Sequence, residues 1–230
     1  MHRLILFDVD GTLLSTNGQA GEALGTALRE TFGTAGPIEH YPWAGKTDPQ
    51  IVFELLGHAG IPRADVQPRL SEVFDVYCDN LARRLTPANT SALAGVHELL
   101  QALGRRSDIA VGLLTGNIRR GADIKLTAAG LGGYFTMGAF GSDQEDRNLL
   151  VAVARERAKA LWGDEFSGTR TTVVGDAEPD IRCARAGGAR SISVASGKTP
   201  RETLATLHPD VLLESLASPL ALPALIGPNG

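Results

Sequence analysis

The 230-residue chain contains 43% apolar and 21% charged residues, an ordinary balance for a globular protein. Its formal net charge of −4 argues against a general electrostatic attraction to nucleic acid or to an anionic membrane. No apolar run is long enough to span a bilayer, and the run before Asp8 is too short for the hydrophobic part of a signal peptide.

The first predicted element is a buried strand over Arg3–Asp8, which continues into the sequence DVDGT at residues 8–12. Residues two apart in a strand lie on one side, so Asp8 and Asp10 are predicted to face a common site. Two carboxylates this close repel each other unless they share a cation or one is protonated. A Mg²⁺ site that also meets a substrate phosphate satisfies this condition at the carboxyl end of the strand.

Residues 16–89 contain no convincing strand, and their apolar residues recur at helical spacing in three stretches. One of these helices is predicted to start at Asp48, with Asp48 as its cap and Pro49 in its first turn. The segment therefore predicts a small helical domain, inserted into a second domain made of residues 1–15 and 90–230.

Short apolar runs alternate with amphipathic helices after about residue 90. This alternation predicts an α/β fold with a Rossmann-like, doubly wound parallel sheet. The helix predicted over 148–162 is expected to bury Leu149, Leu150, Val153, Ala154 and Leu161. The predicted strands are Arg3–Asp8, Ile109–Thr115, Tyr134–Phe140, Thr171–Asp176, Ser191–Ala195 and Val211–Leu213.

Polar residues follow two of the later strands. Thr115 ends a predicted strand, and Gly116 and Asn117 open a helix, where a hydroxyl and free N–H groups form a ready phosphate site. Asp176 ends another strand, and Asp180 follows four residues later, a spacing that fits metal binding. An ordinary helix start explains the Thr115 motif equally well when it is read alone, whereas the joint spacing of Asp176 and Asp180 favours metal binding over a simple helix cap.

Taken together, DVDGT, LLTGN and GDAEPD resemble the first, second and fourth motifs of the haloacid dehalogenase superfamily, over nearly the whole chain. The inserted helices resemble the C1-type cap of that superfamily. The resemblance is to phosphoglycolate phosphatases, and it implies Mg²⁺-dependent hydrolysis of a small phosphate monoester through an aspartyl-phosphate.

The resemblance also implies a role for each motif residue. Asp8 would be the nucleophile, and Asp10 would protonate the leaving oxygen and then deprotonate water. Thr115 and the amides of Gly116 and Asn117 would bind phosphate oxygens. The metal-binding residues would be Asp8, the backbone carbonyl of Asp10, Asp176 and Asp180, the last as a ligand or through hydrogen bonds.

The third motif departs from the superfamily pattern, which usually has a lysine followed by proline at this place. Arg147 lies about midway between the second and fourth motifs, at the start of a predicted helix, and is the favoured cation. Lys159 lies deeper in that helix, and Lys125 belongs to the preceding one. The alternative for Arg147 is a solvated arginine at a helix start.

Gly45 and Lys46 stand at a loop-to-helix boundary, where the superfamily places its substrate-specificity loop. Lys46 is a candidate to pair with a substrate carboxylate or second phosphate, and a solvated surface lysine is an equally good interpretation.

Three other functions fit parts of the pattern. A phosphosugar mutase of the β-phosphoglucomutase type would keep all the core motifs. A phosphonatase would use a cap lysine such as Lys46, but that family usually has alanine in place of Asp10. A regulator without catalytic activity would not need the complete set of aspartates. A haloacid dehalogenase is disfavoured, because those enzymes use no metal and lack the second aspartate.

The expected partner is a small phosphate ester rather than a nucleic acid or a membrane, because a closing cap leaves little room. Cys78 and Cys183 have no metal-ligand spacing, which favours reduced thiols in a cytoplasmic protein. The sequence leaves the oligomeric state and the particular ester open.

Overall fold

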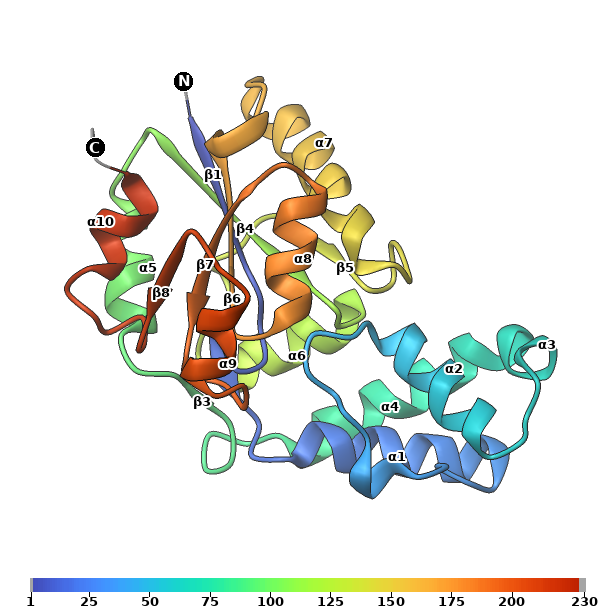
Figure 1. Cartoon of the computed structure of the whole chain (residues 1–230). Coiled ribbons are helices and arrows are strands. Elements are labelled where there is room, and N and C mark those ends of the chain that lie inside the picture. The colour runs from blue at the N-terminus through green and yellow to red at the C-terminus, as the bar shows by residue number, and fades with distance from the viewer. Residues whose placement is uncertain (1, 228–230) are drawn as a thin grey trace.

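Six parallel strands form one sheet in the order β5-β4-β1-β6-β7-β8, in a computed structural model that describes residues 2–227 (Figure 1). The chain builds outward from β1 through β4 to β5, then returns to the other side of β1 and continues through β6 to β8. This doubly wound order confirms the predicted fold class and places the topological switch point, where such sheets bind ligands, beside β1. The strands are β1 (Arg3–Phe7), β4 (Ile109–Thr115), β5 (Gly138–Phe140), β6 (Thr171–Gly175), β7 (Arg190–Val194) and β8 (Val211–Leu213).

Helices cover both faces of the sheet, and each face has its own apolar cluster. Leu4 and Leu6 point to the face covered by α7 and α8, whereas Ile5 and Phe7 point to the face covered by α5, α6 and α10 (Figure 1). Burial on both faces explains why the strands are nearly continuous apolar runs. The core helices are α5 (Val96–Gly104), α6 (Arg119–Ala128), α7 (Leu150–Trp162), α8 (Glu178–Ala186), α9 (Arg201–Thr206) and α10 (Ala221–Ile226).

The predicted strands are confirmed, although β5 is shorter than expected and covers only Gly138–Phe140. The predicted buried stripe of α7 is wrong at two positions, because Leu149 and Leu161 are exposed. Leu149 lies in a 3₁₀ turn that precedes α7, and its tighter winding takes this side chain off the buried face. Leu150 and Ala154 cover the sheet as predicted, together with Val151 and Ala158.

Four helices between the first two core strands form a separate cap, in which α1 and α4 lie side by side (Figure 1). The cap has its own apolar cluster, which extends to Ile118, Ile124 and Ala128 at and within α6, so the cap rests on this core helix. The predicted limits of 16–89 stay a prediction. No helix within residues 2–227 is long and apolar enough to cross a membrane. The cap helices are α1 (Gln19–Phe32), α2 (Asp48–His58), α3 (Arg63–Val66) and α4 (Leu70–Arg84).

Two details at the base of the cap differ from expectation. The chain enters and leaves the cap through a two-stranded antiparallel ribbon of β2 (Leu14–Ser15) and β3 (Ser91–Ala92), which is too short for a recognisable pattern. The N-terminal capping residue of helix α2 is Thr47 rather than Asp48: the Thr47 Oγ1 accepts the Gln50 N–H at 3.3 Å, and Asp48 is the first helical residue. This shift releases the Asp48 carboxylate for a contact with the core.

The loop before α2 lies directly on the loop that follows β4. The Asp48 N–H donates to the Gly116 carbonyl at 2.7 Å, and the Asp48 carboxylate accepts the Ile118 N–H at 2.8 Å. The Thr47 hydroxyl donates to the Glu145 carbonyl at 2.8 Å. A Cβ on Gly116 would lie 2.0 Å from the Lys46 carbonyl oxygen, so only glycine permits this approach. The cap and the core are therefore closed against each other at this point.

We expect Gly116→Ala to reduce the free energy of unfolding by about 1–3 kcal/mol, because the added methyl group must displace the backbone of the cap loop. The matched control is Gly104→Ala at the end of α5, where a Cβ meets nothing within 4 Å. This control is expected to be neutral or slightly stabilising. Denaturant unfolding of both variants checks the prediction, and equal stabilities would contradict it.

Candidate active site

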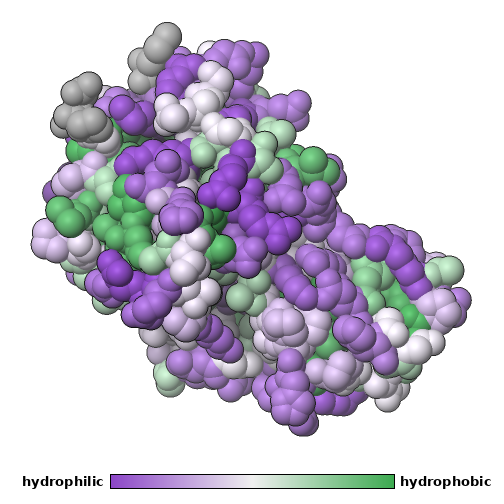
Figure 2. Space-filling view, in the orientation of Figure 1, coloured by the Kyte–Doolittle hydropathy of each residue, from purple (hydrophilic) through white to green (hydrophobic). Residues whose placement is uncertain are grey.

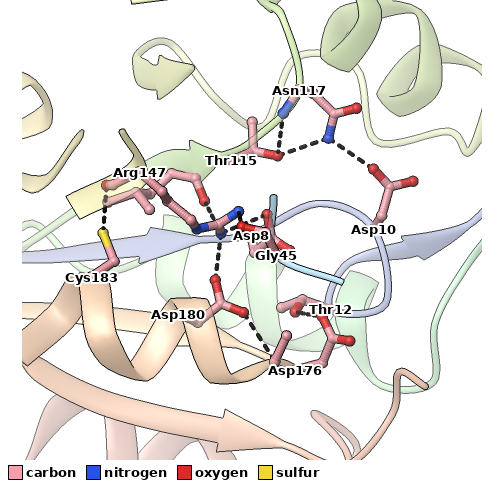
Figure 3. Close-up of polar contacts among 12 residues, drawn as sticks. Asp8, Asp10, Thr12, Gly45, Thr115, Asn117, Arg147, Asp176, Asp180 and Cys183 are labelled. Carbon is pink, nitrogen blue, oxygen red and sulfur yellow. Dashed lines mark hydrogen bonds and ion pairs between the residues drawn. The ribbon is translucent and has the colours of Figure 1, made fainter. Parts of the chain in front are cut away.

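Asp8 and Asp10 lie at the carboxyl end of β1, near the centre of the sheet (Figure 3). Asp8 is 5% exposed, and its N–H continues the ladder to the Val174 carbonyl at 2.9 Å. The chain then turns at Gly11, which has a φ of +82°, and a Cβ there would lie 2.5 Å from Oδ2 of Asp176. The glycine of the DVDGT motif thus allows the turn and leaves space for the neighbouring carboxylate.

Three of the predicted metal ligands are gathered in one cluster. Carboxylate oxygens of Asp8, Asp176 and Asp180 lie within 4.8 Å of one another, and no other such cluster is found within residues 2–227. Asp176 follows β6 and accepts a hydrogen bond from Thr12 Oγ1 at 3.0 Å, a role for Thr12 that the sequence analysis missed. The Asp10 side chain lies apart from this cluster, as expected if only its backbone carbonyl is a ligand.

Arg147 is inserted into the cluster and is 6% exposed (Figure 3). Its Nη2 lies 3.1 Å from Asp8 Oδ1 and pairs with Asp180 Oδ1. The other Asp180 oxygen accepts the Ala177 N–H at 3.1 Å, so both oxygens of Asp180 are occupied. Asp180 therefore lies where it can orient Arg147 rather than bind a metal ion directly. Arg147 Nη1 also donates to the Gly45 carbonyl of the cap loop at 3.1 Å.

Buried negative charge dominates the electrostatics of the cluster. Burial, together with the charges of Asp180 and Asp8, raises the pKa of Asp176 well above its ordinary value. Burial also raises the pKa of Asp180 to about 7, although Arg147 opposes this shift. The Arg147 guanidinium remains charged, because the two carboxylates raise its pKa more than burial lowers it. One guanidinium cannot balance three buried carboxylates, so the donor set fits a divalent cation.

The predicted phosphate-binding residues meet at the end of β4. Thr115 is fully buried, and its Oγ1 accepts hydrogen bonds from Asn117, at 2.8 Å from Nδ2 and 3.3 Å from the backbone N. The same Nδ2 donates to Asp10 Oδ2 at 2.8 Å (Figure 3). The Asn117 side chain therefore connects the loop after β4 to Asp10, a contact that the motif did not predict.

Lys125 is the second buried cation of the site, at 3% exposure. Its Nζ lies 2.7 Å from Asp10 Oδ2 and 2.5 Å from Asn117 Oδ1. Lys159, by contrast, is exposed and pairs with Glu165. Of the three candidate cations, Arg147 lies beside Asp8 and Lys125 lies beside Asp10. One feature of the sequence could have indicated that Lys125 is buried. This lysine lies on the apolar face of α6, next to Leu126 and three residues after Ala122.

Gly45 and Lys46 border a cleft of about 1010 Å³ between the cap and the core. Lys46 Nζ lies 2.5 Å from Glu54 Oε2 and 3.1 Å from the Tyr41 hydroxyl, so its charge is already paired within the cap. The face in view is mostly hydrophilic where the two parts meet (Figure 2). The structure thus brings Lys46 to this cleft, and its predicted contact with substrate requires the Glu54 pair to be shared or broken.

Comparisons with known proteins identify the family of the chain. Residues 5–194 match the family model of the haloacid dehalogenase-like hydrolases, and the chain belongs to this family. It is 27% identical to the phosphoglycolate phosphatase of Pectobacterium atrosepticum, over 96% of this chain and 92% of that protein. It is 26% identical to the pyrophosphatase PpaX of Anoxybacillus flavithermus, over 95% of each protein.

Solved structures support the fold. A haloacid dehalogenase-like hydrolase from Bacteroides fragilis superposes with a TM-score of 0.72 at 20% identity, over 94% of this chain and 99% of that one. CbbY from Rhodobacter sphaeroides, solved in complex with phosphate, superposes with a TM-score of 0.66 at 20% identity, over 99% of this chain and 100% of that one.

We expect Arg147→Met to destabilise the protein by about 3–5 kcal/mol, because it leaves buried carboxylates without their cation. Added Mg²⁺ should restore part of this loss in the variant. The control is Arg182→Met, since the exposed Arg182–Glu178 pair should contribute less than about 1 kcal/mol. Denaturant unfolding with Mg²⁺ and with EDTA measures both effects. Equal stabilities of the two variants would contradict the role of Arg147.

Proposed function

We propose that the protein is a Mg²⁺-dependent phosphatase that hydrolyses a small phosphate monoester through an aspartyl-phosphate on Asp8. The observation that carries this proposal is the position of Asp8, which lies in the acidic cluster and contacts Arg147 through only one oxygen. The other oxygen, Oδ2, accepts no hydrogen bond from the residues between 2 and 227 and is available to attack. The phosphoglycolate phosphatases among the relatives support the same reaction.

In the first step, a carboxylate oxygen of Asp8 attacks phosphorus while the bond between phosphorus and the ester oxygen breaks. Asp10 gives a proton to the leaving oxygen, which departs as an alcohol. Thr115 and the backbone N–H groups beside it bind the phosphoryl oxygens. Arg147 stabilises the negative charge around Asp8, as the usual lysine would, and the same Nη2 also pairs with Asp180.

In the second step, Asp10 removes a proton from a water molecule, and the water oxygen attacks phosphorus. The bond between Asp8 and phosphorus breaks, which returns the carboxylate and releases inorganic phosphate. Asp8, Asp176 and the backbone carbonyl of Asp10 would hold Mg²⁺, with Asp180 placed to orient the site through Arg147. The bound ion would supply positive charge to the phosphate oxygens and to the buried carboxylates.

The core residues described above serve a phosphosugar mutase equally well, so the acceptor of the phosphoryl group separates the two functions. Water as acceptor gives free phosphate, whereas a mutase returns the group to a sugar. The pyrophosphatase among the relatives also makes inorganic pyrophosphate a reasonable test substrate. We favour a small ester such as phosphoglycolate.

We expect Mg²⁺-dependent phosphate release from at least one member of a panel of phosphoglycolate, hexose phosphates and pyrophosphate, and none in EDTA. Asp8→Asn should lower the rate by at least about a thousandfold, because the amide is a far weaker nucleophile. The control variant is Asp123→Asn on the exposed surface of α6, which should keep the wild-type rate. Wild-type activity in Asp8→Asn would rule out the aspartyl-phosphate route.

The affinity for Mg²⁺ should weaken as pH falls from about 8 to about 6. Asp176 and Asp180 have raised pKa values, so each holds its proton up to a higher pH than an ordinary carboxyl group. A proton on Asp176 competes directly with the metal ion, and a proton on Asp180 weakens its hold on Arg147. Calorimetric titration of the folded protein with Mg²⁺ at several pH values measures this dependence, and a constant affinity would contradict it.

A further inference from the structure

We infer that Lys125 is a positioning residue for Asp10: together with Asn117 it fixes one carboxylate oxygen and leaves the other for the substrate. This inference rests on the proposed function, in which Asp10 is the acid and base. It assigns a role to a residue that lies outside the motifs of the sequence.

The burial of Lys125 is the first observation. The residue is 3% exposed, on a face of α6 that otherwise packs Gly121, Ala122 and Leu126. Taking such a charge out of water costs several kcal/mol, and an apolar residue of similar size would avoid that cost. Stability alone therefore does not explain a lysine at this position, whereas contact with a reacting group does.

The second observation is that two donors converge on the same oxygen. Lys125 Nζ lies 2.7 Å and Asn117 Nδ2 lies 2.8 Å from Asp10 Oδ2. Oδ1 of Asp10 accepts no hydrogen bond from any residue in the described range 2–227, and the side chain is 41% exposed. A carboxylate held by one oxygen has a defined direction and keeps the second oxygen for proton transfer.

Asn117 itself is held in the orientation that this arrangement needs. Its Oδ1 accepts from Lys125 at 2.5 Å, so its Nδ2 must face Asp10 and Thr115. A neutral residue in place of Lys125 would remove one donor to Asp10 and would also free the amide to rotate. The loss of Lys125 should therefore affect the direction of Asp10 more than a single hydrogen bond would suggest.

The cap contributes a charge to the same network. Asp48 is buried, and the charges of Lys125 and Asp10 both act on its carboxylate, whose pKa burial raises to about 6. Asp48 also holds the loop that carries Asn117, through the Ile118 N–H at 2.8 Å. The charge of Lys125 thus acts on a core carboxylate and on a cap carboxylate, and it offsets the repulsion between them when the cap is closed.

The test is the steady-state kinetics of Lys125→Met with the preferred ester of the wild-type enzyme. We expect kcat to fall by about tenfold to a hundredfold, with KM changed by less than about twofold, because Asp10 acts on proton transfer and not on binding. In the double variant Asp10→Asn/Lys125→Met, the second substitution should add no further loss. The matched control is Lys159→Met on α7, whose exposed lysine should be dispensable.

A second measurement separates positioning from general damage. With p-nitrophenyl phosphate, the leaving group needs little protonation, so the first step in Lys125→Met should stay fast while water attack becomes slow. Rapid mixing should then show a burst of about one p-nitrophenolate per active site, followed by a slow phase. Slowing of both steps together would indicate a structural defect and would overturn the inference.

The remaining outcomes are also decisive. An unchanged kcat in Lys125→Met, or losses that multiply in the double variant, would show that Lys125 does not act through Asp10. If Lys125→Met does not fold, Lys125→Gln retains an N–H donor, and the same burst and double-variant measurements apply to it. A wild-type protein that releases no phosphate from any ester would overturn the proposed function, and the inference with it.

Discussion

The concentration of negative charge at the carboxyl ends of the two central strands is the constraint on which the rest of the site depends. Carboxylate oxygens of Asp8, Asp176 and Asp180 lie within 4.8 Å of one another, and Asp10 follows Asp8 at the end of β1 with its side chain apart from them. In a poorly hydrated interior, such groups repel each other strongly. Arg147 and Lys125 offset part of this charge, while burial and the remaining repulsion raise the pKa values of Asp176 and Asp180.

The backbone has to come unusually close to these carboxylates, and the glycines of the site follow from that closeness. A Cβ on Gly11 or on Gly197 would overlap the carboxylate of Asp176. The same condition holds where the cap meets the core, because Gly116 accepts the Asp48 N–H and lies under the Lys46 carbonyl. These glycines are therefore required for the close approach of backbone and carboxylates in the site, and not only for the turns in which they lie.

The sequence was sufficient for the parts of the site that are local. The strand that carries Asp8, the strand that precedes Asp176 and the helical insertion are each visible in a short stretch of residues, through apolar runs and turn residues. The contacts between distant segments were not visible in this way. Lys125 and Asp10 are 115 residues apart, and the sequence around each residue contains no signal that the two are in contact. The pairing of Lys46 with Glu54 was not visible either, because it depends on how the loop before α2 folds back on that helix. The sequence therefore left Lys46 as a candidate to contact a substrate.

The two buried cations, Arg147 and Lys125, link the position of the cap to the neutralisation of the aspartates of the site. Arg147 contacts Asp8, the proposed nucleophile, through one nitrogen and the Gly45 carbonyl of the cap loop through another. Lys125 contacts Asp10 directly and experiences the field of Asp48, the first residue of α2. Arg147 therefore connects a core carboxylate to a contact with the cap, and Lys125 connects one to a charge of the cap. If the cap opens, Arg147 loses an acceptor and Lys125 loses a nearby negative charge, while the repulsion among the core carboxylates remains. A closed cap therefore adds one acceptor for Arg147 and one opposing charge near Lys125 to the arrangement that holds the core carboxylates.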